Sequence, residues 1–389
     1  MDIDEDYVGR EQALVKHNLL KSYLEVVLSI IGVSKQATRI TYVDCFAGPW
    51  GPKGTDLKGT SIAISLEIIR GVREALRKLP NVPPIDFQAI YIEKSPGAYA
   101  RLSEYLAAHT PQGIRSVALE GDYRTRMDEV MRICGGGFAF FFIDPKGWSE
   151  IRIEDLAPLL RRPRSEFLIN LMYDFLNRAL GMKAFREKVE LVLGKLTDEE
   201  SASLAHLETA ARGRFVVEKY RASLENAMGG TGSNSPRSYN AAILKPQADR
   251  VLYHLVYLTR HPKGIVEFAK ASEKAEYLQR VVRIQTKRNQ TLQSGLFTAE
   301  EEASAAVHGG VSIQDVKSYW LAKMQSGNLV CDEACLADAL RDTGWLVSDI
   351  QRAFSELIAE GLVENLDARG PRRSRPVHFD ENERLRRVV

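Results

Sequence analysis

Apolar positions follow two different patterns along the first two thirds of the chain. Residues 11–31 place apolar side chains at intervals of three and four, which predicts a helix with a broad buried stripe. Beyond this helix come short runs that are almost entirely apolar, separated by helix-length segments. Such runs are typical of strands that are buried on both faces, so the pattern predicts a parallel sheet with helices on both sides.

The pattern also assigns residue ranges. Strands are expected at 40–43, 87–92, 116–119, 138–143 and 166–171, and helices at 61–79, 97–108, 124–133 and 153–160. Two later strands, 241–245 and 250–259, have no helix-length segment between them and can therefore pair antiparallel. We expect a charge-rich helical insert at 175–235 and a helix at 264–275. Together these elements predict a doubly wound, Rossmann-like α/β domain.

The rest of the chain has a different pattern. Residues 285–310 are polar and alanine-rich, as in a linker between an N-terminal domain that ends at 284 and a second domain. Three short helical patterns follow, at 313–325, 333–342 and 348–360, and then two short β segments around a Gly/Pro/Arg tip. Three helices and a hairpin predict a winged-helix domain over 311–389. Residues 1–34 are expected to form a helix packed on the α/β core, which begins at 35.

Composition sets the class of protein. With 389 residues, 44% hydrophobic and 27% charged, the sequence has the composition of a soluble globular protein with room for two domains. No apolar run is long enough to cross a bilayer, and the acidic first residues do not resemble a secretory signal, so a cytoplasmic protein without membrane contact is expected. Cys331 and Cys335 have no further ligand at zinc-binding spacing, so we expect reduced thiols and no metal.

Charge is informative through its distribution. The net charge of +2 does not indicate a nucleic-acid binder, but residues 369–375, "RGPRRSR", form a basic cluster, and 283–290 form a weaker one. At the tip of a wing, four arginines would contact phosphates: Arg369, Arg372, Arg373 and Arg375. Winged helices also bind proteins, so nucleic acid and a protein partner both stay open.

The stretch "TYVDCFAGPWGPKGT", residues 41–55, contains candidate ligand-binding residues at the end of the first predicted strand. Ligands of such sheets bind beyond the carboxyl ends of the strands, where Asp44 lies. Gly48 and Gly51 would let the backbone approach a ligand closely. The chain has neither the Gly-Lys-Ser/Thr of a P-loop nor a G-x-G-x-x-G motif, so a loop for nucleotide phosphates is not indicated.

An acid follows each of four successive strands: Asp44, Glu93, Asp122 and Asp144. One such acid is often only the N-cap of the next helix, but four at one sheet edge favour a ligand site. Glu93 could accept hydrogen bonds from a ribose diol, and Asp122 from an adenine amino group with the Tyr123 ring beside it. A ligand with ribose and adenine but without phosphates fits this edge, and S-adenosylmethionine is such a ligand.

Several segments together resemble a known family. The segments "VDCFAGPWG", "KGTSIAI", "IYIEKS", "FFFIDPKGW", "FLINLMYDFLNR" and "VLYHLVYLTRHPKGIVEF" are similar to those of the three-Cys-motif partner proteins. The resemblance covers about residues 10–275. It implies a class I methyltransferase fold with seven strands, the last antiparallel, and a radical-SAM-type protein with three cysteines as a partner.

The resemblance also implies roles for individual residues. Asp44 to Gly51, with Phe46, Ala47 and Gly48, would form the S-adenosylmethionine loop. Glu93 would bind the ribose beside Lys94, and Asp122 the adenine beside Tyr123. Asp144, Pro145 and Trp148 would form the catalytic motif, and Asp144 would also contact the cofactor. Lys16 and His17 would cover the cofactor if the first helix folds over the sheet edge.

The residues of the catalytic motif bear on which substrate group would accept the methyl. Amino-methylating enzymes have Asp/Asn-Pro-Pro-aromatic at this position, whereas this chain has Asp-Pro-Lys-Gly-Trp, closer to the Asp-Pro-Phe-Gly of tRNA guanine-N2 methyltransferases. Asp144 would accept hydrogen bonds from an exocyclic amine, and Trp148 would stack on an unpaired RNA or DNA base. The alternative is a catalytically weak scaffold that binds nucleic acid or the partner protein through its winged helix.

Overall fold

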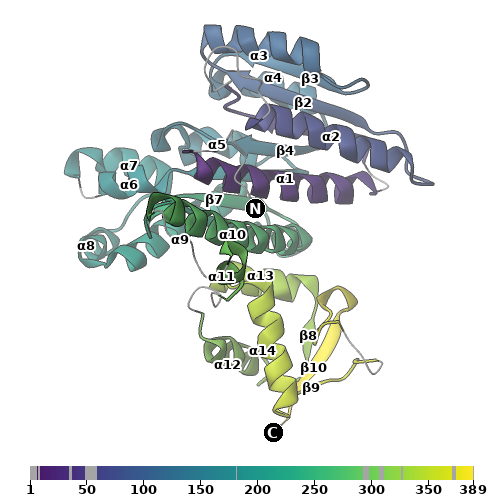
Figure 1. Ribbon diagram of the computed structural model, residues 1–389, viewed down its shortest axis with the longest axis vertical. Coiled ribbons are helices and arrows are strands. Elements are labelled where there is room, and N and C mark those ends of the chain that lie inside the picture. The colour runs from purple at the N-terminus through teal and green to yellow at the C-terminus, as the bar shows by residue number, and fades with distance from the viewer. Residues whose placement is uncertain are drawn as a thin grey trace. The chain divides into compact units, whose positions relative to one another are not determined.

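The computed structural model describes residues 1–389 except 1–6, 8, 35–36, 49–58, 181, 292–297, 306–310, 326, 370–373 and 389. The chain divides into two compact units, Met1–Arg260 and His261–Val389 (Figure 1). The first unit contains a seven-stranded sheet and the second a three-stranded sheet. In the described part of the chain, no helix combines the length and the apolar character needed to cross a membrane.

The large sheet has the predicted mixed α/β character. Its strands are β1 (Arg39–Asp44), β2 (Asp86–Glu93), β3 (Arg115–Glu120), β4 (Phe138–Ile143), β5 (Ser165–Leu171), β6 (Arg237–Leu244) and β7 (Val251–Thr259). Their order is β3-β2-β1-β4-β5-β7-β6. Strands β1 to β5 are parallel, and β7 runs antiparallel between β5 and β6. The strand order reverses between β1 and β4, and a sheet of this kind binds its ligand at that point.

The helices of the first unit that were predicted individually begin and end close to the predicted positions, and the other four lie in the region of the predicted helical insert. They are α1 (Glu11–Gly32), α2 (Ser61–Arg77), α3 (Pro96–His109), α4 (Met127–Cys134), α5 (Ile153–Leu160), α6 (Tyr173–Leu180), α7 (Arg186–Leu193), α8 (Asp198–His206) and α9 (Thr209–Met228). Two short 3-10 turns, η3 (Tyr123–Thr125) and η4 (Trp148–Glu150), follow β3 and β4. The Thr60 hydroxyl accepts a hydrogen bond from the Ala63 N–H, which explains where α2 begins.

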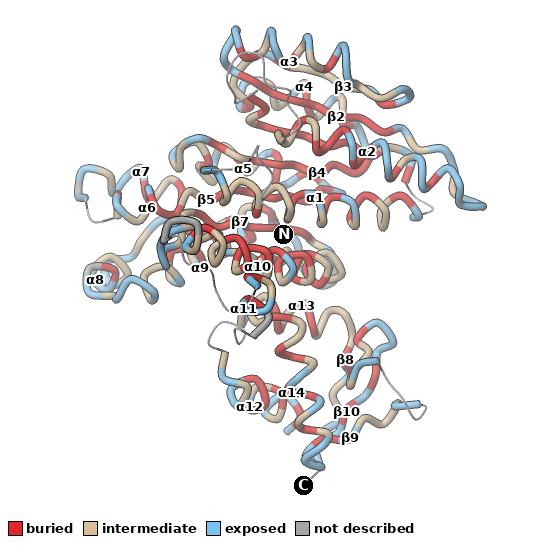
Figure 2. Tube along the Cα trace, in the orientation of Figure 1, coloured by how far each residue is buried: buried red, intermediate tan, exposed pale blue. Residues whose placement is uncertain are grey.

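Strand β4 shows why its sequence is apolar at every position. Ala139, Phe141 and Ile143 belong to the cluster that the sheet forms with α4, α5 and α9. Phe140 points to the opposite face, where its ring centroid lies 6.0 Å from that of Tyr23 on α1. In Figure 2 the central strands are coloured as buried over most of their length. Both faces are therefore covered, as the continuous apolar runs predict.

The second unit comprises α10 (Pro262–Thr291), α11 (Ala299–Ala305), α12 (Ile313–Lys323), α13 (Glu333–Thr343) and α14 (Val347–Ala359), with β8 (Leu329–Cys331), β9 (Val363–Asn365) and β10 (Glu383–Arg387). Helix α10 contacts α11, α13 and α14, and the chain divides before it, after Arg260 rather than after residue 284. Residues 285–291, expected at the start of a linker, continue this helix.

The last three predicted helices correspond to α12, α13 and α14. The second strand of the expected hairpin begins only at Glu383, after the aromatic ring of Phe379 has packed into the core. The Phe379 centroid lies 6.2 Å from the Trp320 ring and 6.1 Å from the Phe354 ring. Phe379 is therefore part of the core of the second unit. Strand β8 was not expected, since three residues give no detectable period.

Candidate active site

Backbone hydrogen bonds bring the predicted acids to one edge of the sheet. The Cys45 N–H donates to the Phe142 carbonyl at 3.0 Å, so the β1–β4 ladder continues past the end of β1. The Ala47 N–H donates to the Ile92 carbonyl at 2.8 Å, and the Gly121 N–H donates to the Glu93 carbonyl at 3.0 Å. The loops after β1 and β3 are therefore fastened to the end of β2.

Asp44 ends β1 in a nearly closed environment, with 1% of its surface exposed. One carboxylate oxygen accepts the Phe46 N–H at 3.1 Å, and the other accepts the Ser61 hydroxyl at 2.7 Å. Burial raises the pKa of Asp44 to about 7, although both hydrogen bonds act to lower it. The carboxyl group therefore exchanges its proton near neutral pH. Ser61 was not among the predicted site residues.

Asp144 follows β4 and is held from two sides. The Lys16 ammonium on α1 lies 2.5 Å from its Oδ2, and the Asn170 amide on β5 donates to its Oδ1 at 2.6 Å. The exposed fractions of the Lys16 and Asp144 side chains are 14% and 22%, so solvent screens this ion pair only partly. Helix α1 does reach the sheet edge, where Lys16 contacts a carboxylate.

Asn170 is a site residue that sequence reasoning missed. It is buried, and within the described part of the chain its Oδ1 has no hydrogen-bond partner. A buried acceptor without a partner costs about 1–3 kcal/mol, so it is a suitable place for a donor from a ligand. The signal in the sequence was a polar side chain near the end of an otherwise apolar strand, on the same face of the sheet as Asp144.

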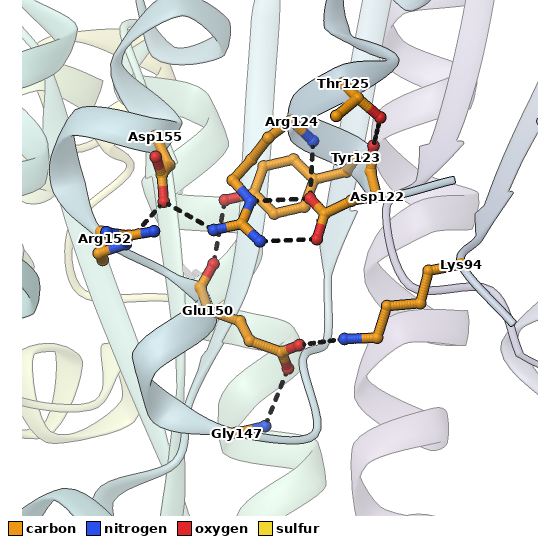
Figure 3. Close-up of polar contacts among 9 residues, drawn as sticks. All are labelled: Lys94, Asp122, Tyr123, Arg124, Thr125, Gly147, Glu150, Arg152 and Asp155. Atoms are coloured by element: carbon orange, nitrogen blue, oxygen red, sulfur yellow. Dashed lines mark hydrogen bonds and ion pairs between the residues drawn. The ribbon is translucent and has the colours of Figure 1, made fainter. Parts of the chain in front are cut away.

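The turn after Asp144 is shaped by Glu150, another residue that was not predicted. The Gly147 N–H donates to Glu150 Oε2 at 3.2 Å, and the Lys94 ammonium lies 2.7 Å from Glu150 Oε1 (Figure 3). Pro145 is buried in this turn, and Trp148 packs partly against the core. Glu150 thus connects the predicted catalytic turn to the end of β2. The spacing of three residues from Gly147 to Glu150 is that of a capping box.

Glu93 and Lys94 face different surroundings. Glu93 is buried, and its Oε1 accepts the Ser95 N–H at 2.6 Å. The side chains that the structure describes contribute no hydrogen bond to its other oxygen. Lys94 is 59% exposed and contacts Glu150, which raises the pKa of the lysine. Glu93 therefore remains suited to a diol, whereas the described contact of Lys94 is to the catalytic turn.

Asp122, the predicted adenine acceptor, already holds a cation. Its Oδ1 accepts from the Arg124 N–H at 3.0 Å and from Nε at 2.8 Å, and its Oδ2 accepts from Nη2 at 2.7 Å (Figure 3). The hydrogen bond to the Arg124 guanidinium is the main reason that the pKa of Asp122 is lowered. Arg124 also reaches Asp155 at 3.4 Å, which in turn pairs with Arg152 at 2.9 Å.

Tyr123 belongs to the core of the site. It is buried, its ring centroid lies 5.2 Å from that of Phe46, and its hydroxyl donates to the Glu150 carbonyl at 3.0 Å (Figure 3). The ring thus joins the loop after β1 to the turns after β3 and β4. Ala47 is buried beside it, and the Gly48 N–H donates to the Phe46 carbonyl at 2.9 Å.

Some predicted site residues cannot be compared with the structure. Gly51, Arg372 and Arg373 lie outside the described residues. Arg369 and Arg375 belong to the second unit and are exposed there.

Among the described residues, one group of potential metal ligands is His378, Glu381 and Glu383, whose ligand atoms lie within 4.8 Å of one another. Glu383 Oε2 already accepts from the His378 N–H and the Asn365 amide, both at 2.8 Å, and so has a structural role.

The carboxylates of the sheet edge can accept hydrogen bonds and therefore suit a ligand with hydroxyl and amino groups. Glu93 has a carboxylate oxygen available to a diol, and Asp44 can accept from an amine once it is ionised. Lys16, Lys94 and Arg124, three described cations of this edge, each contact a carboxylate, so their charge is largely balanced there.

Comparison with protein-family models found no match for this chain, and comparison with curated proteins found none.

Proposed function

We propose that the chain is an S-adenosylmethionine-dependent methyltransferase whose acceptor is an exocyclic amine of an RNA or DNA base. The observation that supports this most strongly is Asp144, which lies where the strand order reverses and is held by Lys16 and Asn170. A seven-stranded sheet with β7 reversed also supports the class I methyltransferase fold.

The residues present fit the cofactor. Glu93 would accept hydrogen bonds from the ribose hydroxyls, and Asp44 would accept from the amine of the methionine part. Asp122 retains lone pairs for the adenine amino group beside its pair with Arg124. When bound, S-adenosylmethionine supplies an electrophilic methyl group on a sulfonium.

The chain's own residues would hold the acceptor. Asp144 would accept an N–H of the amine, as its Oδ2 now accepts the Lys16 ammonium, and would thereby aim the nitrogen lone pair at the methyl group. Asn170 fixes the other oxygen of Asp144 and so preserves its orientation. Trp148, partly exposed after the turn, would stack on an unpaired base. The proton released from the amine would pass to Asp144 or to water.

Titration calorimetry with S-adenosylmethionine tests the cofactor assignment. We expect binding to the wild type and a roughly 10- to 100-fold weaker affinity for Glu93→Gln, because a charge-assisted hydrogen bond is worth about 1.5–3 kcal/mol. Glu154→Gln, on α5, is the matched control and should bind as the wild type does. The absence of both heat and a shift in melting temperature with the wild type would refute the assignment.

A second candidate function is a scaffold with little catalytic activity. The ion pairs Lys16–Asp144 and Arg124–Asp122, together with Lys146 inside the catalytic turn, favour it. Cofactor binding without methyl transfer to any nucleic acid would support this scaffold.

In a scaffold of this kind, the second unit would be the part that binds the partner molecule. From α12 onward, its order of helix, strand, two helices and two strands supports a winged-helix assignment. This unit would bind nucleic acid or a radical-SAM-type protein with three cysteines. Salt-dependent binding of RNA or DNA that is lost on replacing Arg369, Arg372, Arg373 and Arg375 would favour nucleic acid. Unchanged affinity would exclude the tip as the contact.

A further inference from the structure

A cluster of cations surrounds a buried carboxylate beside the candidate active site. Asp174, on α6, is 6% exposed in its side chain. Arg250 Nε donates to its Oδ1 at 2.7 Å, Lys245 Nζ lies 3.2 Å from its Oδ2, and Arg178 Nη2 lies 3.7 Å from the same oxygen. We call Phe175, Arg178, Lys245 and Arg250 the cationic rim.

The rim has more positive charge than its own carboxylate balances. Arg178, Lys245 and Arg250 share one buried Asp174 and are 58%, 34% and 50% exposed. Asp249, in the same turn, offsets part of the excess and is exposed. A buried carboxylate that fixes three half-exposed cations keeps them preorganised at the surface, as a binding site for a polyanion requires.

An aromatic platform accompanies these charges. The Phe175 side chain is 46% exposed, and the Arg178 guanidinium lies 4.7 Å from its ring centroid. The Arg178 Nε also donates to the Asp174 carbonyl at 3.2 Å, which holds the guanidinium in place. One exposed phenylalanine alone is ordinary, but a ring with a fixed guanidinium against it matches the surfaces on which unpaired bases stack.

The rim is continuous with the candidate active site. Asp174 follows Asn170 by four residues, and Asn170 donates to Asp144. On the other side, Arg250 directly precedes β7, where the Tyr253 ring centroid lies 5.8 Å from the Lys16 ammonium. The Tyr253 hydroxyl donates to the Gln12 carbonyl on α1 at 2.9 Å. Rim and Asp144 therefore share one edge of the sheet.

We propose that the cationic rim binds a single-stranded segment of nucleic acid, with phosphates on Lys245 and Arg250 and a base on Phe175 and Arg178. Binding itself needs only the rim, whereas delivery of an unpaired base to Asp144 rests on the proposed function. The site is distinct from the arginine tip of the second unit, so the first unit has a nucleic-acid contact of its own.

Fluorescence anisotropy with labelled single-stranded RNA and DNA of one sequence, and with the matching duplex, tests the proposal on the full chain. We expect Lys245→Ala/Arg250→Ala to weaken single-strand binding at least tenfold and to reduce the slope of log K against log salt by about 1.4, since two phosphate contacts are lost. Phe175→Ala should weaken binding about 5- to 100-fold without changing the slope.

Control variants separate binding from folding. Arg186→Ala, an exposed arginine of α7 paired with Glu190, should leave the affinity unchanged. Asp249→Asn should tighten binding, since it removes an acid next to the rim. Because Phe175 is exposed, Phe175→Ala should keep the wild-type melting temperature.

Changes below twofold for both rim variants would overturn the proposal, and so would a preference for the duplex. If the rim variants lose affinity while S-adenosylmethionine gives no heat, the rim is supported and the proposed methyltransferase function fails. If RNA and DNA differ in affinity, the preferred strand identifies the nucleic acid that the rim binds.

Discussion

The carboxylates at the centre of the sheet edge and the one beyond β3 come from the same sequence pattern but have different surroundings. Asp44 and Asp144, after β1 and β4, are held by Ser61, Lys16 and Asn170. Asp122 pairs with Arg124, which is 35% exposed. The central acids lie where the strand order reverses, whereas Asp122 follows β3, the outermost strand of the parallel half.

The two regions also differ in the main influence on the pKa of the carboxylate. At the centre, burial is the largest influence on Asp44 and raises its pKa to about 7. At the outer strand, a hydrogen bond from Arg124 is the largest influence on Asp122 and lowers its pKa. Exposed ion pairs are screened by salt and have small interaction energies. We therefore expect substitutions at the central acids to change the catalytic rate more than substitutions around Asp122.

The largest effect is expected for Asp144→Asn. Loss of the charged acceptor should reduce kcat for methyl transfer about 10²- to 10³-fold, the range seen when one preorganised polar group is removed from an active site. Single-turnover rates with saturating cofactor measure it. Asp155→Asn, which changes the partner of Arg124 and Arg152, is the matched control and should change the rate less than threefold. Equal losses in both variants would remove the distinction between centre and outer strand.

Asn170→Ala should come next. Asp144 would lose one of its two described hydrogen bonds, and a bond to a charged group is worth about 1.5–3 kcal/mol, so kcat should fall about 10- to 100-fold. The affinity for S-adenosylmethionine should fall less than kcat does, because Asp144 is the one predicted cofactor residue that Asn170 is described as contacting. Steady-state kinetics and calorimetry together measure this split. A loss of cofactor affinity with unchanged kcat would contradict the role given to Asn170.

The pH dependence of stability should reveal Asp44. Its folded pKa of about 7 lies above the ordinary value, so its contribution is fully present below about pH 4 and is lost as the pH rises through 7. Asp44→Asn removes this dependence. The stability of the variant relative to the wild type should therefore rise between pH 5 and pH 8, by up to about 3 kcal/mol.

Urea unfolding at both pH values measures the effect. His17 and the buried His254, whose pKa values are lowered by desolvation to about 3 and about 4, act in the opposite direction and are present in both proteins. Their contribution is present above about pH 6.5 and is lost as the pH falls, so it cancels in the difference. A difference that does not change with pH would show that Asp44 is not buried as described.

The smallest effect is expected for the exposed ion pair between the end of β2 and the turn after β4. Lys94→Ala removes an exposed ion pair with Glu150 and should change the free energy of unfolding by about 0–1 kcal/mol. The difference between variant and wild type should vanish in 1 M salt, which thermal unfolding at low and high salt would detect. A larger loss of stability that does not depend on salt would contradict this expectation and show that the pair is as strongly held as the central acids.

The sequence predicts the elements better than the contacts. Continuous apolar runs such as "FAFFFI" indicate strands buried on both faces, and the large sheet has them at its centre. The site is predictable only in part. Asp44 and Asp144 are visible as acids at strand ends, but Asn170 and Lys16 reach Asp144 from 26 and 128 residues away, and no local pattern indicates such pairs. Asp122, the predicted adenine acceptor, is the opposite case, because its partner Arg124 is only two residues away in the sequence.

The central claim is that this edge transfers a methyl group to nucleic acid. Incubation with methyl-labelled S-adenosylmethionine and either total RNA or total DNA tests it directly. We expect label in one of the two pools with the wild type, and a signal at least a hundredfold lower with Asp144→Asn. No label in either pool with a cofactor-binding wild type, or equal label with both proteins, would contradict the claim.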